Sequence, residues 1–375
     1  MRDHHRPLTR RPPEHGGAEE VDQPPERLGT IVAIPRELGA SEPQAGGSSR
    51  GLRRILRQCL IAALACVVSF TGFSFVYNLA PERAVPYPPG LKFVQTGDIK
   101  TRYREWGTSG TSVLLLHGFI ESADTWAPTA ERLARDHRVY AVDLDGYGYS
   151  QRVAPYDTAH QTQQVLDFIS VMHLQRPIVV GHSSGAAIAG AVALAAPRNV
   201  GGVMFLDGDG LPLDGTANGG RDTSGFNLPI PQPYRTTLLR LVVRSDDVIR
   251  AVYELACGPR CPTLTEAAVD QWRRPFQVAG AEPVALAVLG AGIPALPVAD
   301  QHRLASLPMP KSVVYGANDP EYAPGSAAQT AARIGAPAPT LIPNARHLTL
   351  ISDPATVAAA VEKLATRAAA STNGK

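Results

Sequence analysis

The sequence lacks an excess of charge of either sign and shows no internal repeat. Its 36 lysines and arginines nearly balance 34 aspartates and glutamates, which leaves a formal net charge of +2. Nucleic-acid-binding proteins normally carry a strongly basic stripe. The balanced charge therefore gives no reason to expect a nucleic-acid partner.

Cysteine is scarce, with four residues in 375. Cys59 and Cys66 lie in an apolar run, where cysteine acts as a small apolar side chain. Cys257 and Cys261 flank Gly-Pro-Arg in "ACGPRCP", which favours a tight loop. One cysteine pair without nearby histidines is a poor zinc site. The sequence therefore predicts a local disulfide, which suits an oxidising compartment, and no metal site.

The N-terminal segment has no apolar periodicity long enough to form a core. Residues 1–57 mix Pro, Gly and charges of both signs, and such a composition cannot offset the entropy cost of ordering. We expect a disordered tail here. It is either a cytoplasmic interaction segment or an inert extension, including one that arises from a mistaken start site.

A run without any charged residue covers 58–79. At about 1.5 Å per residue its length reaches the roughly 30 Å of a bilayer core, which predicts one transmembrane helix in contact with membrane lipid. Four arginines precede it: Arg50, Arg53, Arg54 and Arg57. The positive-inside bias then predicts a single-pass protein of the cell membrane, with a cytoplasmic N-terminus and an extracytoplasmic remainder. A cleaved signal peptide and a buried helix of a soluble domain fit this segment less well.

After a linker at 80–91, short apolar strands alternate with helical segments over 92–368. Continuous apolar runs are typical of strands that helices cover on both faces, so we predict an α/β domain with a mostly parallel sheet. The strands are expected at 112–117, 138–143, 177–181, 201–207, 311–316 and 340–343, after an antiparallel hairpin at 91–106. The helices are expected near 123–135, 159–173, 184–196, 322–334 and 354–368. A helical cap insertion is expected at 208–307, and a flexible tail at 369–375.

The strongest chemical signal is "VVGHSSG", in which a strand leads into a helix of small residues. This is the G-x-S-x-G nucleophile elbow, with Ser183 on a strained turn between strand and helix. Small neighbours are required on both sides of such a turn. The helix dipole behind the hydroxyl favours developing negative charge.

A second loop, "LLLHGFIESADTW", also follows a strand end. The backbone N–H of Phe119 can point into the site from this loop and form an oxyanion hole with the N–H of Ser184. His117 is expected to shape the loop through hydrogen bonds rather than to act as the base.

A serine nucleophile needs a base, and the base needs an orienting acid. Asp319 follows one late strand and His347 follows the last strand, in the chain order Ser, Asp, His that this arrangement requires. We assign His347 as general base and Asp319 as its orienting acid. The rival acids are Asp207 and Asp209, with Glu321 a weaker one.

Other polar and aromatic residues receive structural interpretations. The turn from Asp143 to Ser150 is expected to support the site from below. His182 is expected to pack rather than to take part in catalysis. Trp272 and Phe276 are four residues apart on a predicted helix and fit the core of the cap better than a substrate pocket.

At these residues the chain resembles the α/β-hydrolase superfamily, over about residues 92–368. The similarity is to the capped group that contains cofactor-free esterases, carbon–carbon bond hydrolases, perhydrolases and epoxide hydrolases. "HGFIESADTW" is similar to the epoxide-hydrolase and dehalogenase loop, but those enzymes use an aspartate where this chain has Ser183. The resemblance implies the α/β-hydrolase fold and a small-molecule acyl substrate, with ester, thioester, amide or carbon–carbon cleavage that needs no metal or organic cofactor.

Three functions follow as hypotheses. The leading one is a membrane-anchored carboxylic-ester hydrolase. A carbon–carbon hydrolase or perhydrolase with the same three residues is the second. The third is a catalytically idle hydrolase-like protein that binds a ligand, against which the intact order of Ser, Asp and His argues.

Overall fold

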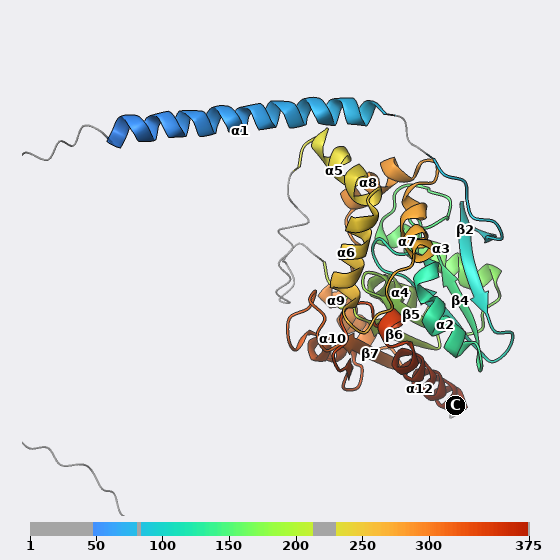
Figure 1. Ribbon diagram of the computed structural model, residues 1–375. Helices are drawn as coiled ribbons and strands as arrows, with labels where there is room; N and C mark the ends of the chain where they lie inside the picture. The colour runs from blue at the N-terminus through green and yellow to red at the C-terminus, as the bar shows by residue number, and fades with distance from the viewer. Residues whose placement is uncertain (1–47, 81–83, 213–229, 374–375) are drawn as a thin grey trace, which may run out of the picture. The chain divides into compact units, whose positions relative to one another are not determined.

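The computed structural model describes residues 48–80, 84–212 and 230–373 (Figure 1). The chain divides into two compact units, Met1–Ala62 and Ala63–Lys375. Most of the tail predicted at 1–57 lies outside the described residues.

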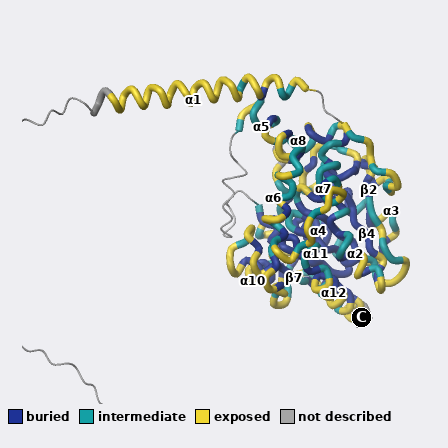
Figure 2. Tube along the Cα trace, viewed as in Figure 1, coloured by how far each residue is buried: buried dark blue, intermediate teal, exposed yellow. Residues whose placement is uncertain are grey.

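Helix α1 (Ser48–Leu79) contains the apolar segment. Within it, Gly51–Leu79 contains an 18-residue window with a mean hydropathy of 2.3 and is long and apolar enough to cross a membrane. Figure 2 shows it exposed along most of its described length. The predicted helix at 58–79 is present but begins earlier, because arginine and leucine in the preceding turns are good helix formers. The prediction that the disordered tail extends to residue 57 is therefore wrong for residues 48–57.

One sheet of eight strands forms the centre of the second unit, in the order β1-β2-β4-β3-β5-β6-β7-β8. The six strands from β4 to β8 in this order run parallel, and β1 and β2 form an antiparallel hairpin at one edge. The predicted α/β fold and its mostly parallel sheet are confirmed. The strands are β1 (Lys92–Thr96), β2 (Ile99–Trp106), β3 (Thr111–Leu116), β4 (His137–Val142), β5 (Ile178–His182), β6 (Gly202–Leu206), β7 (Lys311–Gly316) and β8 (Thr340–Ile342).

Helices cover both faces of the sheet, and the strands are apolar on both sides for that reason. In β5 the side chain of Val179 packs into one core, whereas Ile178 and Val180 pack into the other. The first core is covered by α3 (Thr158–Val171), α4 (Gly185–Ala195), α9 (Val298–Ala305) and α10 (Ser326–Ile334). The second is covered by η1 (Ala123–Trp126), α2 (Ala127–Leu133), α11 (Thr349–Ser352) and α12 (Pro354–Asn373).

Within the hydrolase domain, three helix boundaries differ from the sequence prediction by four residues or more. The helix expected at 123–135 is a 3-10 turn followed by α2, which begins at Ala127. Helix α10 begins only at Ser326, because Gly325 before it has a left-handed backbone with φ +88°. Helix α12 continues to Asn373, so the flexible tail expected at 369–375 is helical over its described part.

The long segment between β6 and β7 is helical where it is described, and residues 213–229 lie outside the described residues. Its helices are α5 (Tyr234–Val243), α6 (Asp246–Cys257), α7 (Glu266–Arg273), η2 (Arg274–Phe276) and α8 (Ala281–Ala291), followed by α9. We call α5 to α8 the insertion helices. Helix α9 packs on α4 and α10, so it belongs to the layered domain and not to the expected cap at 208–307.

The predicted disulfide is confirmed. Cys257, the last residue of α6, is bonded to Cys261. Cys59 and Cys66 in α1 are free and exposed.

Candidate active site

Ser183 occupies a sharp turn between β5 and α4. Its backbone is left-handed, with φ +51°, and its N–H donates to Leu206 O at 2.9 Å. Gly181 and Gly185, which flank the turn, must be glycine because a Cβ at either position would collide with the backbone. A Cβ at Gly181 would lie 2.1 Å from Gly185 O, and one at Gly185 would lie 2.6 Å from His117 O. A non-glycine residue in the left-handed region is costly, so this turn holds the serine under strain at the edge of the sheet.

The loop after β3 lies directly against Ser183. A Cβ added to Gly118 would lie 2.9 Å from the Ser183 Cβ, so only glycine allows this approach. His117 shapes the loop, because its Nδ1 donates to Gly118 O at 2.8 Å and its Nε2 accepts from Leu144 N at 3.0 Å. Burial lowers the pKa of His117, which keeps the ring neutral as these two bonds require. The structural role predicted for His117 is confirmed.

The structure brings Asp319 and His347 together from different loops. Asp319 follows β7, and His347 lies between β8 and α11. His347 Nδ1 donates to Asp319 Oδ2 at 2.8 Å, and both residues are buried. The second Asp319 oxygen accepts from the Glu321 N–H at 2.9 Å. The carboxylate is therefore fixed, and it fixes the orientation of the imidazole.

Glu321 lies on the other side of the same ring. Its Oε1 is 3.4 Å from His347 Nε2, and its side chain is half exposed. Burial alone would lower the pKa of His347, but Asp319 and Glu321 raise it to about 10. Among the described residues, no hydrogen bond joins Ser183 Oγ to the His347 ring, and Nε2 faces Glu321 instead.

His182, the residue before Ser183, connects three loops of the site. Its Nε2 donates to His347 O at 2.9 Å, and its Nδ1 lies 2.8 Å from Glu121 Oε1. Glu121 in turn accepts from Gly118 N at 3.2 Å and from the Thr125 hydroxyl. The sequence predicts a packing role for His182 and does not single out Glu121. The acid within "HGFIES" and the histidine within "GHSSG" were the available signals.

The pKa shifts of Glu121 and His182 agree, because each residue favours the charged form of the other. Burial would raise the pKa of Glu121, but His182 lowers it. Burial would lower the pKa of His182, but Glu121 raises it. Both side chains are almost fully buried. The site thus contains a buried carboxylate–imidazole contact in which each partner favours the charged form of the other, and removal of either partner leaves the other buried without it.

The two rival acids have other partners. Asp207 accepts from Gly316 N at 2.7 Å and from the N–H and hydroxyl of Thr349, which joins β6, β7 and the loop that carries His347. Burial raises the pKa of Asp207 to about 7. Asp209 accepts from Leu211 N at 2.9 Å. Neither carboxylate is bonded to the His347 ring in the described structure.

Asp143 supports the site from below, as predicted. It accepts from Ala123 N and Tyr149 N, both at 2.7 Å, and from Arg102 at 3.2 Å. Its carbonyl accepts from the Ser150 hydroxyl. These bonds join the turn after β4 to the start of η1.

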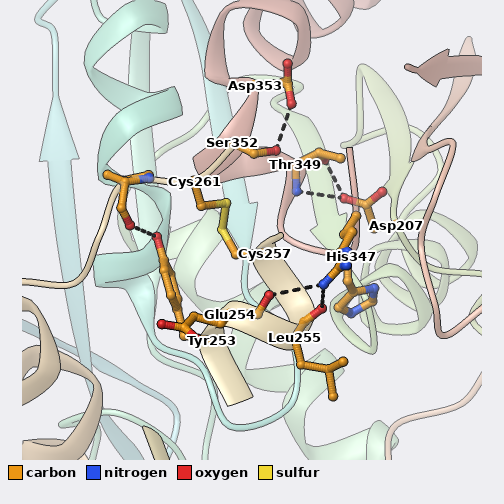
Figure 3. Close-up of a disulfide and its surroundings, with 12 residues drawn as sticks. Asp207, Tyr253, Glu254, Leu255, Cys257, Cys261, His347, Thr349, Ser352 and Asp353 are labelled. Atoms are coloured by element: carbon orange, nitrogen blue, oxygen red, sulfur yellow. Dashed lines mark hydrogen bonds between the residues drawn. A yellow bond between two sulfur atoms is a disulfide. The ribbon is translucent and has the colours of Figure 1, made fainter. Parts of the chain in front are cut away.

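The C-terminal end of α6 holds the loop that carries His347 (Figure 3). His347 N donates to Ala256 O at 2.9 Å, and Arg346 donates to the carbonyls of Glu254 and Leu255. The Cys257–Cys261 disulfide closes the loop that follows directly. An insertion helix therefore fixes one boundary of the candidate site.

A second insertion segment faces the loop after β3. Trp272, Pro275 and Phe276 lie opposite Ile120 and Glu121 across a cavity of about 10 Å³. Trp272 also packs edge-to-face on Tyr253, with ring centroids 6.1 Å apart, as expected for the core of a cap. A larger cavity of about 560 Å³ lies elsewhere, between β2 and α7, and is lined by Arg102, Arg104 and Asp270 among others.

Comparison with known proteins gives the chain a family. Residues 113–360, more than half of the chain, match the model of the alpha/beta hydrolase family. An uncharacterized protein of Mycobacterium tuberculosis is 33% identical over 138 residues, 36% of this chain and 40% of that protein. Epoxide hydrolase 2 of Caenorhabditis elegans is 32% identical over 124 residues, 32% of this chain and 35% of that protein. The chain thus spans well under half the length of these curated relatives.

One solved structure is similar over most of both chains. It is described as a membrane phospholipase A and a bacterial virulence factor, and it is 21% identical with a TM-score of 0.60. The similarity covers 84% of this chain and 99% of that one, and at this identity it shows the fold alone. The fold, the strained serine between β5 and α4, and the family match lead to one conclusion: this chain belongs to the alpha/beta hydrolase family.

Proposed function

We propose that this chain is a membrane-anchored serine hydrolase that cleaves a carboxylic ester, with Ser183, His347 and Asp319 as its catalytic triad. The observation that carries the proposal is the pairing of Asp319 with His347 Nδ1 at the sheet edge where Ser183 stands on its strained turn. When the His347 ring is neutral, the fixed carboxylate selects the tautomer whose Nε2 carries no proton, which is the form that a general base needs.

The reaction follows from these positions. His347 Nε2 takes the Ser183 proton as Oγ attacks the ester carbonyl carbon. The N–H groups of Phe119 and Ser184 stabilise the oxyanion. His347 then protonates the leaving alcohol, and a water molecule releases the acid and restores Ser183. During this reaction, His347 Nε2 must exchange its contact with Glu321 for one with Ser183 Oγ. Substrate binding therefore has to displace the glutamate.

The N-terminal helix supports the anchor. Gly51–Leu79 has the length and hydropathy of a membrane span, and arginines precede its apolar part. The positive-inside bias places the N-terminus in the cytoplasm and the hydrolase domain outside. The disulfide at the end of α6 is consistent with an oxidising exterior. Protease added to intact cells should then degrade the hydrolase domain, and its survival there would reverse the orientation.

The test of the activity is labelling by a fluorophosphonate, which reacts with activated serines. We expect wild-type protein and Ser170→Ala, a control at an exposed serine on α3, to be labelled, and Ser183→Ala to remain unlabelled. Absence of labelling in folded wild-type protein would favour an idle binding protein. Hydrolysis of p-nitrophenyl butyrate but not of a vinylogous diketone would separate ester hydrolysis from carbon–carbon cleavage, and a perhydrolase would transfer the acyl group to hydrogen peroxide.

A further inference from the structure

Helix α5 carries an exposed apolar face. Leu238, Leu241 and Val242 are 40%, 41% and 46% exposed, and their spacing of three and four residues places them on one side of the helix. Thr237 and Val243 on the same helix are buried. The helix is therefore packed on one side and presents a row of large apolar side chains on the other.

The packed side of α5 is fixed to the start of α8. Arg240 Nε donates to Glu282 Oε2 at 2.8 Å, and Arg244 Nε donates to Glu282 Oε1 at 2.9 Å. The Glu282 side chain is 6% exposed. A buried carboxylate shared by two guanidinium groups leaves α5 little freedom to move away from α8.

The start of α8 is in turn attached to the linker that follows the membrane helix. Val85 N donates to Gln277 O at 2.8 Å, and the Val85 side chain packs against Tyr149, Val278 and Ala281. Five residues lie between Leu79, the end of α1, and Val85. Even if the chain is fully extended, the six steps from Leu79 to Val85 span only about 20 Å, at about 3.4 Å each.

The short connection between α1 and Val85 indicates that the lipid surface covers the apolar face of α5. If α1 spans the bilayer, the start of α8 stays within about 20 Å of the end of the span, and α5 stays with α8. The headgroup layer on each side of a bilayer is itself roughly 5–8 Å thick. A face of three side chains is too small to bind membranes alone, but tethering makes its contact with the lipid surface intramolecular and so raises the effective concentration.

Exposed apolar side chains continue from α5 towards the site. Helix α6 follows α5 directly, and its Val252 and Leu255 are 44% and 64% exposed. The next residue, Ala256, accepts the hydrogen bond from His347 N. An acyl chain that leaves the bilayer near α5 thus finds apolar contacts next to the loop that carries the general base.

We propose that the exposed face of α5 docks on the lipid bilayer and that the natural substrates are carboxylic esters whose acyl chains reside in that bilayer. This rests on the proposed function, since it names the substrate class of the same site. The reaction is ester hydrolysis: water adds across the acyl–oxygen bond, and the products are a fatty acid and an alcohol.

Docking is tested on the full chain in phosphatidylcholine vesicles that contain a doxyl-labelled phosphatidylcholine. An NBD fluorophore is attached to Leu241→Cys in a Cys59→Ser, Cys66→Ser background, which leaves the disulfide intact. The matched control is Leu341→Cys, at a residue 53% exposed on β8. We expect the lipid to quench NBD strongly at position 241 and weakly at 341. Equal quenching overturns the docking, and a 241–241 cross-link between two chains would identify a second copy as the occupant instead.

The substrate class is tested with the Leu241→Asp, Val242→Asp double variant and with Leu341→Asp as control. Hydrolysis of p-nitrophenyl palmitate carried in the vesicles should fall by about tenfold or more in the double variant, because charged residues do not enter lipid. Hydrolysis of p-nitrophenyl butyrate in water should be unchanged in both variants, which also shows that they fold. If both esters are hydrolysed at wild-type rates, this inference fails and the proposed function stands. If wild type hydrolyses neither, the proposed function fails.

Discussion

The imidazole of His182 donates from Nε2 to the backbone carbonyl of His347 at 2.9 Å. The residue that precedes the proposed nucleophile therefore holds the loop of the proposed base. Because the other ring nitrogen contacts Glu121 at 2.8 Å, the same imidazole also holds the loop that would supply the oxyanion hole. The relative positions of nucleophile, base and oxyanion donors thus depend on the buried contact between Glu121 and His182.

We predict that Glu121→Gln lowers kcat for p-nitrophenyl butyrate by about tenfold or more while KM changes little, since positions and not binding contacts are lost. Removing one partner of a buried pair also costs about 3–5 kcal/mol of the free energy of unfolding. Steady-state kinetics and urea unfolding check both effects. The matched control is Glu105→Gln, which breaks the exposed pair with Lys92 and should leave both quantities nearly unchanged. An unaltered kcat in a stable Glu121→Gln protein would remove the positioning role.

Two substitutions of a carboxylate by an amide distinguish between the candidate acids Asp319 and Asp207. Asp319→Asn is expected to reduce kcat by about 10⁴, because an amide can hold the imidazole in the wrong tautomer. Asp207→Asn is expected to affect stability more than chemistry, because Asp207 bonds to Gly316 and Thr349 rather than to the His347 ring. Fluorophosphonate labelling rates for both variants provide the measurement. The reverse ranking would assign the acid to Asp207.

Features that depend on neighbouring residues in the chain can be predicted from the sequence, whereas contacts between distant residues cannot. The strands β3, β5 and β6 and the elbow at Ser183 were predictable, because each is a continuous apolar run or a short motif with local steric rules. The Glu121–His182 pair was not, because 61 positions separate two ordinary polar residues that meet only when β3 and β5 pair. The sequence predicts α9 as part of the insertion for a similar reason, since only its packing on α4 and α10 shows where it belongs.

The contact between Glu321 and His347 predicts a specific pH dependence. His347 must be neutral to accept the Ser183 proton, and nearby carboxylates raise its pKa to about 10, so kcat/KM should rise as the pH increases towards that value. Besides Asp319 and Glu321, the titratable groups that face this ring are Asp207, His182 and Tyr322. Glu321→Gln removes one carboxylate and should shift the rising limb to lower pH, by up to about one unit because Glu321 is half exposed.

The shift should shrink at high salt, which screens an exposed charge. The control is Glu362→Gln, at an exposed position on α12, which should not move the profile. Folding stability changes in the opposite direction to activity, because the stability that charged His347 provides is complete below its ordinary pKa of 6.5 and is lost as the pH rises towards 10. An unchanged pH profile in Glu321→Gln would show that the glutamate does not influence the base.

The last prediction concerns the disulfide at the end of α6. Cys257 and Cys261 are four residues apart, and closing so short a loop stabilises a protein by only about 2 kcal/mol. The effect on activity should be larger than this value suggests, because the carbonyls of Glu254, Leu255 and Ala256 hold Arg346 and His347. We expect the Cys257→Ser, Cys261→Ser double variant to lose most of its kcat at a temperature where thermal unfolding in detergent shows it still folded. Cys59→Ser, Cys66→Ser is the matched control and should behave as wild type, because neither cysteine lies in the hydrolase domain. If the first double variant keeps its kcat until it unfolds, α6 holds the base loop without help from the covalent bond.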